Sequence, residues 1–236
     1  MSATRNPGRV AGFLYLLLLT GVFNLIYVPS KVIVPGNATA TAKNVLAHEM
    51  LFRMGIVSGL FSSVFFILLA MGLYRLLSGV NKTYASLMVV FVAVSAGISF
   101  LNEVNSIAAL ILFRGADFLA VFDQPQREAL GMLFLRLHSQ GNFVNEMFWG
   151  LWLFPFGVLV KRSRFLPRLL GILLIVNSFA YVAISLTWLL LPAYGPLAFR
   201  AAQPALMGEL WILLWLLIKG AKVQPSLATA SSSVNG

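Results

Sequence analysis

Long apolar stretches alternate with short polar stretches along the whole chain. Six apolar stretches have the length of a membrane-spanning helix, because the roughly 30 Å hydrocarbon core of a bilayer takes about 20 helical residues. They cover residues 10–28, 54–74, 84–113, 142–160, 166–191 and 201–218. The pattern predicts an all-α fold, a polytopic transmembrane helix bundle of six spans with short interfacial helices on the outer side.

Two segments outside these spans have patterns of their own. Residues 126–140 hold Leu130, Leu133, Phe134 and Leu137 at i, i+3, i+4 and i+7 spacing. This spacing predicts an amphipathic helix that lies on, or leads into, the outer membrane surface. Residues 224–236 are small and polar, which predicts a disordered tail. We therefore expect one transmembrane domain over residues 1–223.

The composition excludes several classes of protein. The chain is 59% hydrophobic and 10% charged, outside the range of soluble proteins, in which roughly 45 to 50% of residues are apolar. Cysteine is absent, which excludes disulfides, cysteine-ligated metals and thiol nucleophiles. Water is therefore not the main solvent of this chain, and the lipid bilayer is its predicted partner.

The net charge of +10 follows the predicted topology. If the six spans alternate, both termini and the loops after spans two and four lie on one side of the membrane. These segments contain no acid, and their bases are Arg5, Arg9, Arg75, Lys82, Lys161, Arg162, Arg164, Arg168, Lys219 and Lys222. By the positive-inside rule both termini are cytoplasmic. The charge needs no nucleic-acid partner, and it predicts a multi-pass membrane protein with both termini on the cytoplasmic side.

Polar residues gather near the outer ends of the predicted spans. In RLHSQGNFVNEMFWG (136–150), His138, Asn142 and Glu146 lie four residues apart and share one helix face. At 1.5 Å per residue, Arg53 and Glu103 reach a similar depth on other spans. We expect Arg53 to pair with Glu103 or Glu146, and we expect these groups to line a cleft that opens outward.

Glu209 is predicted to lie deeper than these groups. It precedes Lys219 by ten residues, about 15 Å of helix, which places it near the bilayer midplane. An ionised carboxylate there costs about 2.5 to 3.5 kcal/mol, so Glu209 should face the interior, protonated or paired. The candidate ligand-binding residues are then Arg53, Glu103, His138, Asn142, Glu146 and Glu209.

Three functions fit these candidates. The first is binding or transport of a small molecule or a proton. In the second, the polar groups only satisfy one another between helices, and the protein is a structural or accessory membrane protein. The third, less favoured, is an enzyme that holds a metal or haem through His48 and His138; the sequence lacks the H-E-x-x-H and G-x-S-x-G motifs. The cofactor, the ligand and the oligomeric state stay open.

The chain also resembles a known family. Its segments VIVPGNATATAKNVLAHEMLFRMGIV, RLHSQGNFVNEMFWGLWLFPFGVLV, RFLPRLLGILL and GELWILLWLLIKG are similar, in this order, to bacterial membrane proteins of the domain of unknown function 4386. The similarity includes His138 and Glu209, whereas the pair Asn145-Glu146 is not expected throughout the family. The resemblance implies a polytopic protein of the bacterial cytoplasmic membrane, and it implies no activity.

Overall fold

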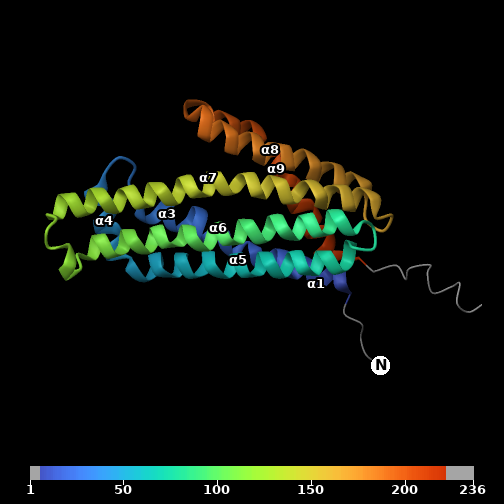
Figure 1. The fold of residues 1–236 in the computed structure, drawn as a ribbon, viewed down its shortest axis with the longest axis horizontal. Helices are drawn as coiled ribbons and strands as arrows, with labels where there is room; N and C mark the ends of the chain where they lie inside the picture. Colours follow the sequence, from blue (N-terminus) through green and yellow to red (C-terminus); the bar gives the residue numbers. More distant parts are fainter. Residues whose placement is uncertain (1–5, 222–236) are drawn as a thin grey trace, which may run out of the picture.

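The computed structural model describes residues 6–221 and forms a helical bundle (Figure 1). Within that range, six helical segments are long and apolar enough to cross a membrane. They are Pro7–Val32, Glu49–Leu77, Lys82–Arg114, Gln124–Arg162, Arg168–Leu190 and Pro192–Ile218. The predicted all-α fold with six spans is confirmed, and the chain is a multi-pass membrane protein. The tail predicted over residues 224–236 lies outside the described residues.

The first span is built from several short helical elements. These are α1 (Pro7–Leu18), α2 (Thr20–Val22), the π-helix η1 (Phe23–Tyr27) and α3 (Val28–Val32). The other spans are long helices: α5 (Glu49–Leu77), α6 (Lys82–Arg114), α7 (Gln124–Arg162), α8 (Arg168–Leu190) and α9 (Gly195–Ile218). Short helices occupy the connections, namely α4 (Ala38–Ala47) and the 3-10 helices η2 (Asp117–Leu119) and η3 (Pro192–Tyr194). The first span is therefore the least regular.

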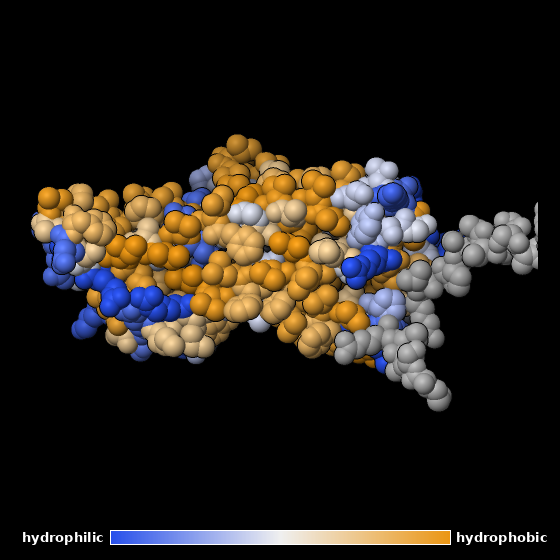
Figure 2. All heavy atoms as spheres, turned by 60° about the horizontal axis from the view of Figure 1, so that its bottom comes forward, coloured by the Kyte–Doolittle hydropathy of each residue, from blue (hydrophilic) through white to orange (hydrophobic). Residues whose placement is uncertain are grey.

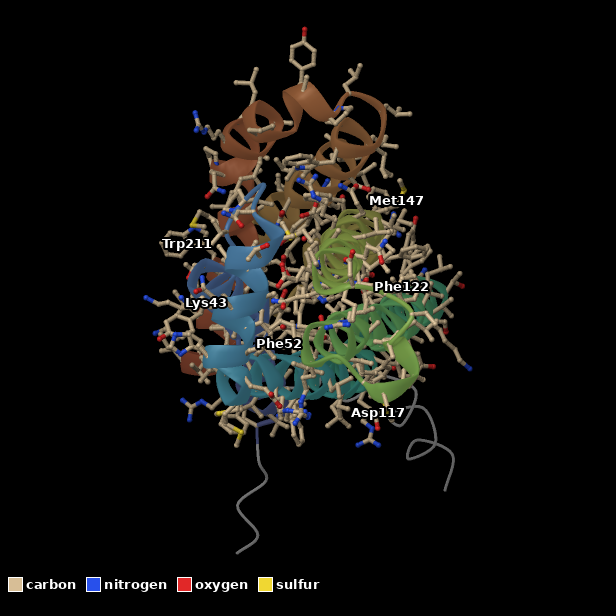
Figure 3. The ribbon with its side chains drawn as sticks, turned by 90° about the vertical axis from the view of Figure 1, so that its left-hand side faces the viewer. Lys43, Phe52, Asp117, Phe122, Met147 and Trp211 are labelled. Atoms are coloured by element: carbon tan, nitrogen blue, oxygen red, sulfur yellow. The ribbon has the colours of Figure 1, made fainter. Side chains whose placement is uncertain are left out.

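The spanning helices form a ring around a common interior. Each of α5 to α8 packs against the next spanning helix along the chain, and α1 packs against both α5 and α9. The view along the bundle in Figure 3 shows this arrangement. Gly8 and Gly12 close the ring, because a Cβ on Gly12 would lie 2.7 Å from the Cα atom of Leu217 on α9. Helices approach this closely only where small residues meet.

The two ends of the bundle differ in the segments they carry. Asn6 accepts a hydrogen bond from the Ala221 backbone N–H (3.1 Å), so the two ends of the described chain lie together. We call this the inner end, and the opposite end, with α4 and η2, the outer end (Figure 1). Hydrophilic atoms gather at both ends in Figure 2, and an apolar band lies between them. Such a band is the surface expected of a protein that contacts a lipid bilayer.

The buried residues form two apolar cores separated by a polar layer. On α7, Leu135 belongs to the outer core and Trp152 to the inner core, and the buried residues Asn145 and Glu146 lie between them. The same order recurs on α6, where Asn102 and Glu103 separate outer from inner core residues. Each polar layer falls at the middle or outer half of its helix. The polar side chains therefore meet one another inside the bundle.

The amphipathic segment 126–140 leads into the membrane rather than lying on it. It is the first part of α7, a helix of 39 residues and therefore roughly 58 Å long. Asp123 and Gln126 start this helix with reciprocal side-chain to backbone hydrogen bonds, a capping box. Because α7 is much longer than a hydrocarbon core is thick, its outer part extends beyond the bilayer. The separate short helix α4 packs against α6 and α7 there, the position expected of an interfacial helix.

Candidate functional site

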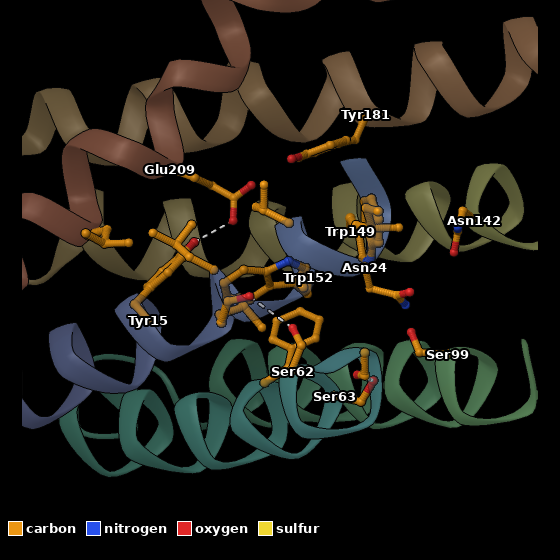
Figure 4. Close-up of a pocket in the computed structure, with 18 of the residues that line it drawn as sticks. Tyr15, Asn24, Ser62, Ser63, Ser99, Asn142, Trp149, Trp152, Tyr181 and Glu209 are labelled. Atoms are coloured by element: carbon orange, nitrogen blue, oxygen red, sulfur yellow. Dashed lines mark hydrogen bonds between the residues drawn. The ribbon is translucent and has the colours of Figure 1, made fainter. Parts of the chain in front are cut away.

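A cavity of about 320 Å³ lies inside the ring and is lined by all six spans (Figure 4). This volume is at the lower end of the roughly 300 to 1,000 Å³ typical of small-molecule sites. Its polar lining residues gather in two places along the bundle axis. Glu209 lies toward the inner end, and Glu103 lies toward the outer end with Asn24, Ser99 and Asn142. Aromatic rings of α7 and α8 lie between the two groups (Figure 4).

The inner end of the cavity is built around Glu209 on α9. Its carboxylate Oε1 accepts a hydrogen bond of 2.5 Å from the hydroxyl of Tyr15 on α1. Tyr181 of α8 lines the same part of the cavity, and its hydroxyl is turned toward Glu209 (Figure 4). The Tyr15 bond joins α1 to α9 about one turn beyond Gly12 along α1. Glu209 therefore points into the bundle, the orientation expected from the cost of turning it toward lipid.

The outer end of the cavity is built around Glu103 on α6. Asn24 donates a hydrogen bond of 2.5 Å from Nδ2 to Glu103 Oε1. Asn24 lies in the π-helix η1, where the Val28 N–H bonds back five residues to the carbonyl of Phe23. Pro29, which has no N–H, follows directly. A π-turn within a membrane span is uncommon and is frequently found at functional sites.

Gly59 of α5 makes room for this contact. A Cβ on Gly59 would strike Asn24 Nδ2 and Glu103 Oε1 and would lie 3.1 Å from Glu103 Cδ. Any larger residue at this position would therefore separate Asn24 from Glu103. The outer end of the cavity therefore depends on Gly59, although glycine has no side chain that could bind a ligand.

A smaller cavity of about 100 Å³ adjoins the first on its outer side. His138 lines it, and His138 Nε2 lies 3.5 Å from Glu103 Oε1. Asn142 lines both cavities and accepts a hydrogen bond of 3.1 Å from Asn102. Asn24 also lines both. Glu103, Asn24 and Asn142 thus form the border between the two cavities.

The carboxylates of the polar layer lack strong counterions. Among residues 6–221, Glu103, Glu146 and Glu209 have no Lys or Arg within 4.0 Å, and His138 is the one basic group beside Glu103. The Oε2 atoms of Glu103 and Glu146 are buried and have no hydrogen-bond partner in the same part of the chain. Buried polar atoms are normally paired, so these oxygens are exceptions that need an explanation.

The structure brings most of the predicted site residues together. Glu103, Asn142 and Glu209 line the main cavity, and His138 lines the adjoining one. Glu146 is buried on α7 between Asn142 and Trp149 but lines neither cavity. What these residues bind stays a prediction.

The predicted partner of Arg53 was wrong. Its Nε lies 2.7 Å from Oε1 of Glu49, one turn earlier on α5, and not near Glu103 or Glu146. The side chain is 47% exposed at the outer end of the bundle and lines neither cavity. A carboxylate four residues away on the same helix is reached without crossing the bundle, so the local pair forms instead of the interhelical one.

Sequence reasoning missed Tyr15 and Asn24, two polar side chains that the first span contributes. Both lie in a span whose hydropathy predicts only membrane insertion. A signal was present for Asn24, an amide in the apolar run LLLLTGVFNLIYV five residues before Pro29. No comparable signal marks Tyr15, because a tyrosine in a membrane span is common and its partner Glu209 is distant along the chain.

No group of three His, Cys, Asp or Glu residues within the described range lies close enough to hold a metal ion. His48 is exposed at the junction of α4 and α5 and lines neither cavity. The structure therefore does not bring His48 into the site that contains Glu103 and His138.

Comparison with known proteins identifies a family and a relative of this chain. The profile described as Domain of unknown function (DUF4386) matches residues 10–220. The chain is 27% identical over 162 residues to an "Uncharacterized protein" of Archaeoglobus fulgidus, covering 68% of this chain and 80% of the relative. No solved structure matches the chain. The expected bacterial origin is not tested by these comparisons.

Proposed function

The chain belongs to the family described as Domain of unknown function (DUF4386). From the geometry of the site, we propose that the protein binds and transports a small molecule in the central cavity. The observation that carries this proposal is a cavity with two carboxylates that all six spans line. A purely structural polar layer would be expected to pair its groups and leave no space between them.

Glu209 is the residue we propose to link binding to a proton. It lies on α9 in the middle of the bundle and has a hydroxyl partner, Tyr15, but no Lys or Arg partner among residues 6–221. Intramembrane acids in this situation commonly belong to ion or proton pathways. Glu209 would be protonated when the cavity is empty and would release its proton when a ligand supplies a compensating charge.

Native mass spectrometry of protein purified in a mild detergent tests the binding proposal. Leu206→Trp should fill the cavity from α9, since Leu206 lines it. Leu197→Trp is the matched control, because Leu197 lies on the same helix, is 65% exposed and lines neither cavity. We expect a bound small molecule of discrete mass on the wild type and on Leu197→Trp, and its loss from Leu206→Trp. A wild type without a bound molecule, or equal occupancy in all three proteins, would contradict the proposal.

We propose that the inner end of the bundle faces the cytoplasm of the cell. In the described chain this end carries Arg9, Arg75, Lys82, Lys219 and the bases of the α7–α8 connection, which are Lys161, Arg162, Arg164 and Arg168. Reporter fusions after Lys82 and Ser163 should therefore report cytoplasm, and fusions near Asn37 and Asp117 the exterior. An exterior signal after Ser163 would reverse the orientation.

A further inference from the structure

The charged residues in the described lining of the main cavity are all acidic. Glu103 and Glu209 line it, and no Lys, Arg or His is among its described lining residues. An ionised carboxylate inside a membrane needs a counterion or a proton, because its hydration has been removed. His138 is the nearest base to Glu103 and lies on the adjoining cavity. The main cavity therefore disfavours an anion and favours a cation.

The carboxylate of Glu103 is incompletely paired. Glu103 is 5% exposed and lines the cavity, and its Oε1 is already bonded to Asn24. Its Oε2 is buried and has no partner within residues 6–221. Asn24 and His138 are thus the polar groups beside a carboxylate that lines the cavity, and no Lys or Arg lies within 4.0 Å of it among the described residues. A positively charged ligand group in the cavity would compensate the charge of Glu103.

Aromatic rings surround the space between the two carboxylates. Trp149 and Tyr181 line it and meet edge to face at 5.9 Å between ring centroids. Phe66 and Trp152 line it from α5 and α7 and meet in the same way at 5.1 Å. The face of an aromatic ring attracts a cation, and aromatic rings are the usual partners of quaternary ammonium groups in proteins.

Between its polar groups, the wall formed by the first span and α9 contains an apolar patch. Leu18, Leu19, Val22, Leu206 and Leu210 line it, and Leu19, Val22 and Leu210 are also more than 40% exposed. Toward the outer end, α9 contains Pro204, and the outer parts of α8 and α9 project away from the rest of the bundle (Figure 1). A proline within a helix is a common cause of such bends. This wall suits the apolar part of a ligand and faces the bilayer.

Resting on the proposed binding function, we propose that the ligand is an amphipathic organic cation. Its ammonium group lies among the aromatic rings near Glu103 or Glu209, and its apolar part lies against the leucines of the α1–α9 wall. The charge of the cation replaces the proton of a carboxylate, so the net charge inside the membrane does not change when it binds.

Phenyltrimethylammonium is a suitable probe, and tert-butylbenzene is its neutral isostere with carbon in place of nitrogen. Binding of each probe to detergent-purified wild-type protein is measured by isothermal titration calorimetry or by the change in intrinsic tryptophan fluorescence, to which Trp149 and Trp152 contribute. We expect the cation to bind at least tenfold more tightly than the isostere. Equal affinity for both probes, or tighter binding of the isostere, would overturn the proposal without any variant being made.

Variants then locate the charge that recognises the cation. Glu103→Gln and Glu209→Gln keep the shape of the side chain, and at least one should weaken phenyltrimethylammonium binding tenfold or more while leaving tert-butylbenzene binding unchanged. Glu128→Gln is the matched control, because Glu128 is a buried acid on α7 that bonds to Thr39 and Gln124 and lines neither cavity. Equal losses in Glu128→Gln and in both cavity variants would contradict recognition by Glu103 or Glu209.

The two proposals fail in different ways. If the isostere binds as well as the cation and Leu206→Trp abolishes both, the cavity is a binding site but not for cations. If neither probe binds, and Leu206→Trp loses no bound molecule that the wild type carries, the binding function itself is wrong.

Discussion

The inner and outer halves of the contact between the first and last spans are built in opposite ways. At the inner end, Gly8 and Gly12 let the backbones of α1 and α9 touch, and the backbone N–H of Gly8 bonds to the Ala221 carbonyl at 3.0 Å. At the outer end, the first span widens into the π-helix η1, and α9 contains Pro204. The same two helices therefore close the ring at one end and enclose a cavity farther out.

The comparison shows where the bundle can tolerate change. Backbone contact leaves no room for an added side chain, whereas a cavity loses only open space when it is partly filled. The inner half should therefore determine stability, and the outer half should determine binding.

The largest effect is expected at Gly12. Gly12→Leu should lower the stability by about 3 kcal/mol or abolish folding, because its Cβ alone would lie 2.7 Å from backbone atoms of α9. Thermal unfolding in detergent measures the loss. The matched control is Gly97→Leu on α6, where a Cβ meets nothing within 4 Å. Similar losses in both variants would show that the α1–α9 contact is not special.

A smaller loss is expected at Gly59, beside the cavity. Gly59→Ala should destabilise the protein by about 1 to 2 kcal/mol, because the new methyl group pushes Asn24 away from Glu103. Gly97→Ala, in open space, should be neutral or stabilising, because alanine favours the helix by about 1 kcal/mol over glycine. Equal unfolding temperatures of the two variants would mean that Asn24 and Glu103 move apart without a loss of stability.

Removal of the hydrogen bond between Tyr15 and Glu209 should cost less stability than the substitution at Gly59. Tyr15→Phe should cost about 1 kcal/mol, the typical net value of a hydrogen bond, or about 0.6 kcal/mol by the average for membrane helices. A double-mutant cycle with Glu209→Leu, which removes the acceptor, isolates the interaction from the effects of each change alone. A coupling energy of zero would show that the two side chains do not stabilise the closed ring.

The smallest effect is expected at Arg53. Arg53→Gln should change stability by less than about 0.5 kcal/mol, because its pair with Glu49 is a single-turn pair at an exposed position. The probe affinity should stay the same, since Arg53 lines neither cavity. A tenfold change in phenyltrimethylammonium affinity would show that Arg53 takes part in binding, contrary to its position outside both cavities.

The candidate site could be predicted where polarity and depth were decisive. Glu103, Asn142 and Glu209 were identified because each is a polar group within an apolar span, and turning such a group toward lipid costs free energy. Arg53 was misplaced because its depth matched that of Glu103, but depth does not specify which helix lies beside it. Glu49, its actual partner, was available one turn away.

Hydropathy along the sequence determined the number of spans and the common side of the two termini, because each span must satisfy its backbone hydrogen bonds within one helix of bilayer length. Only the tertiary structure decided which side chains meet across the interior. The Tyr15–Glu209 and Asn24–Glu103 contacts join residues separated by 194 and 79 positions. They depend on the order of helices in the ring, the π-turn that orients Asn24 and the close approach at Gly12, which are properties of packing between helices and not of any one span.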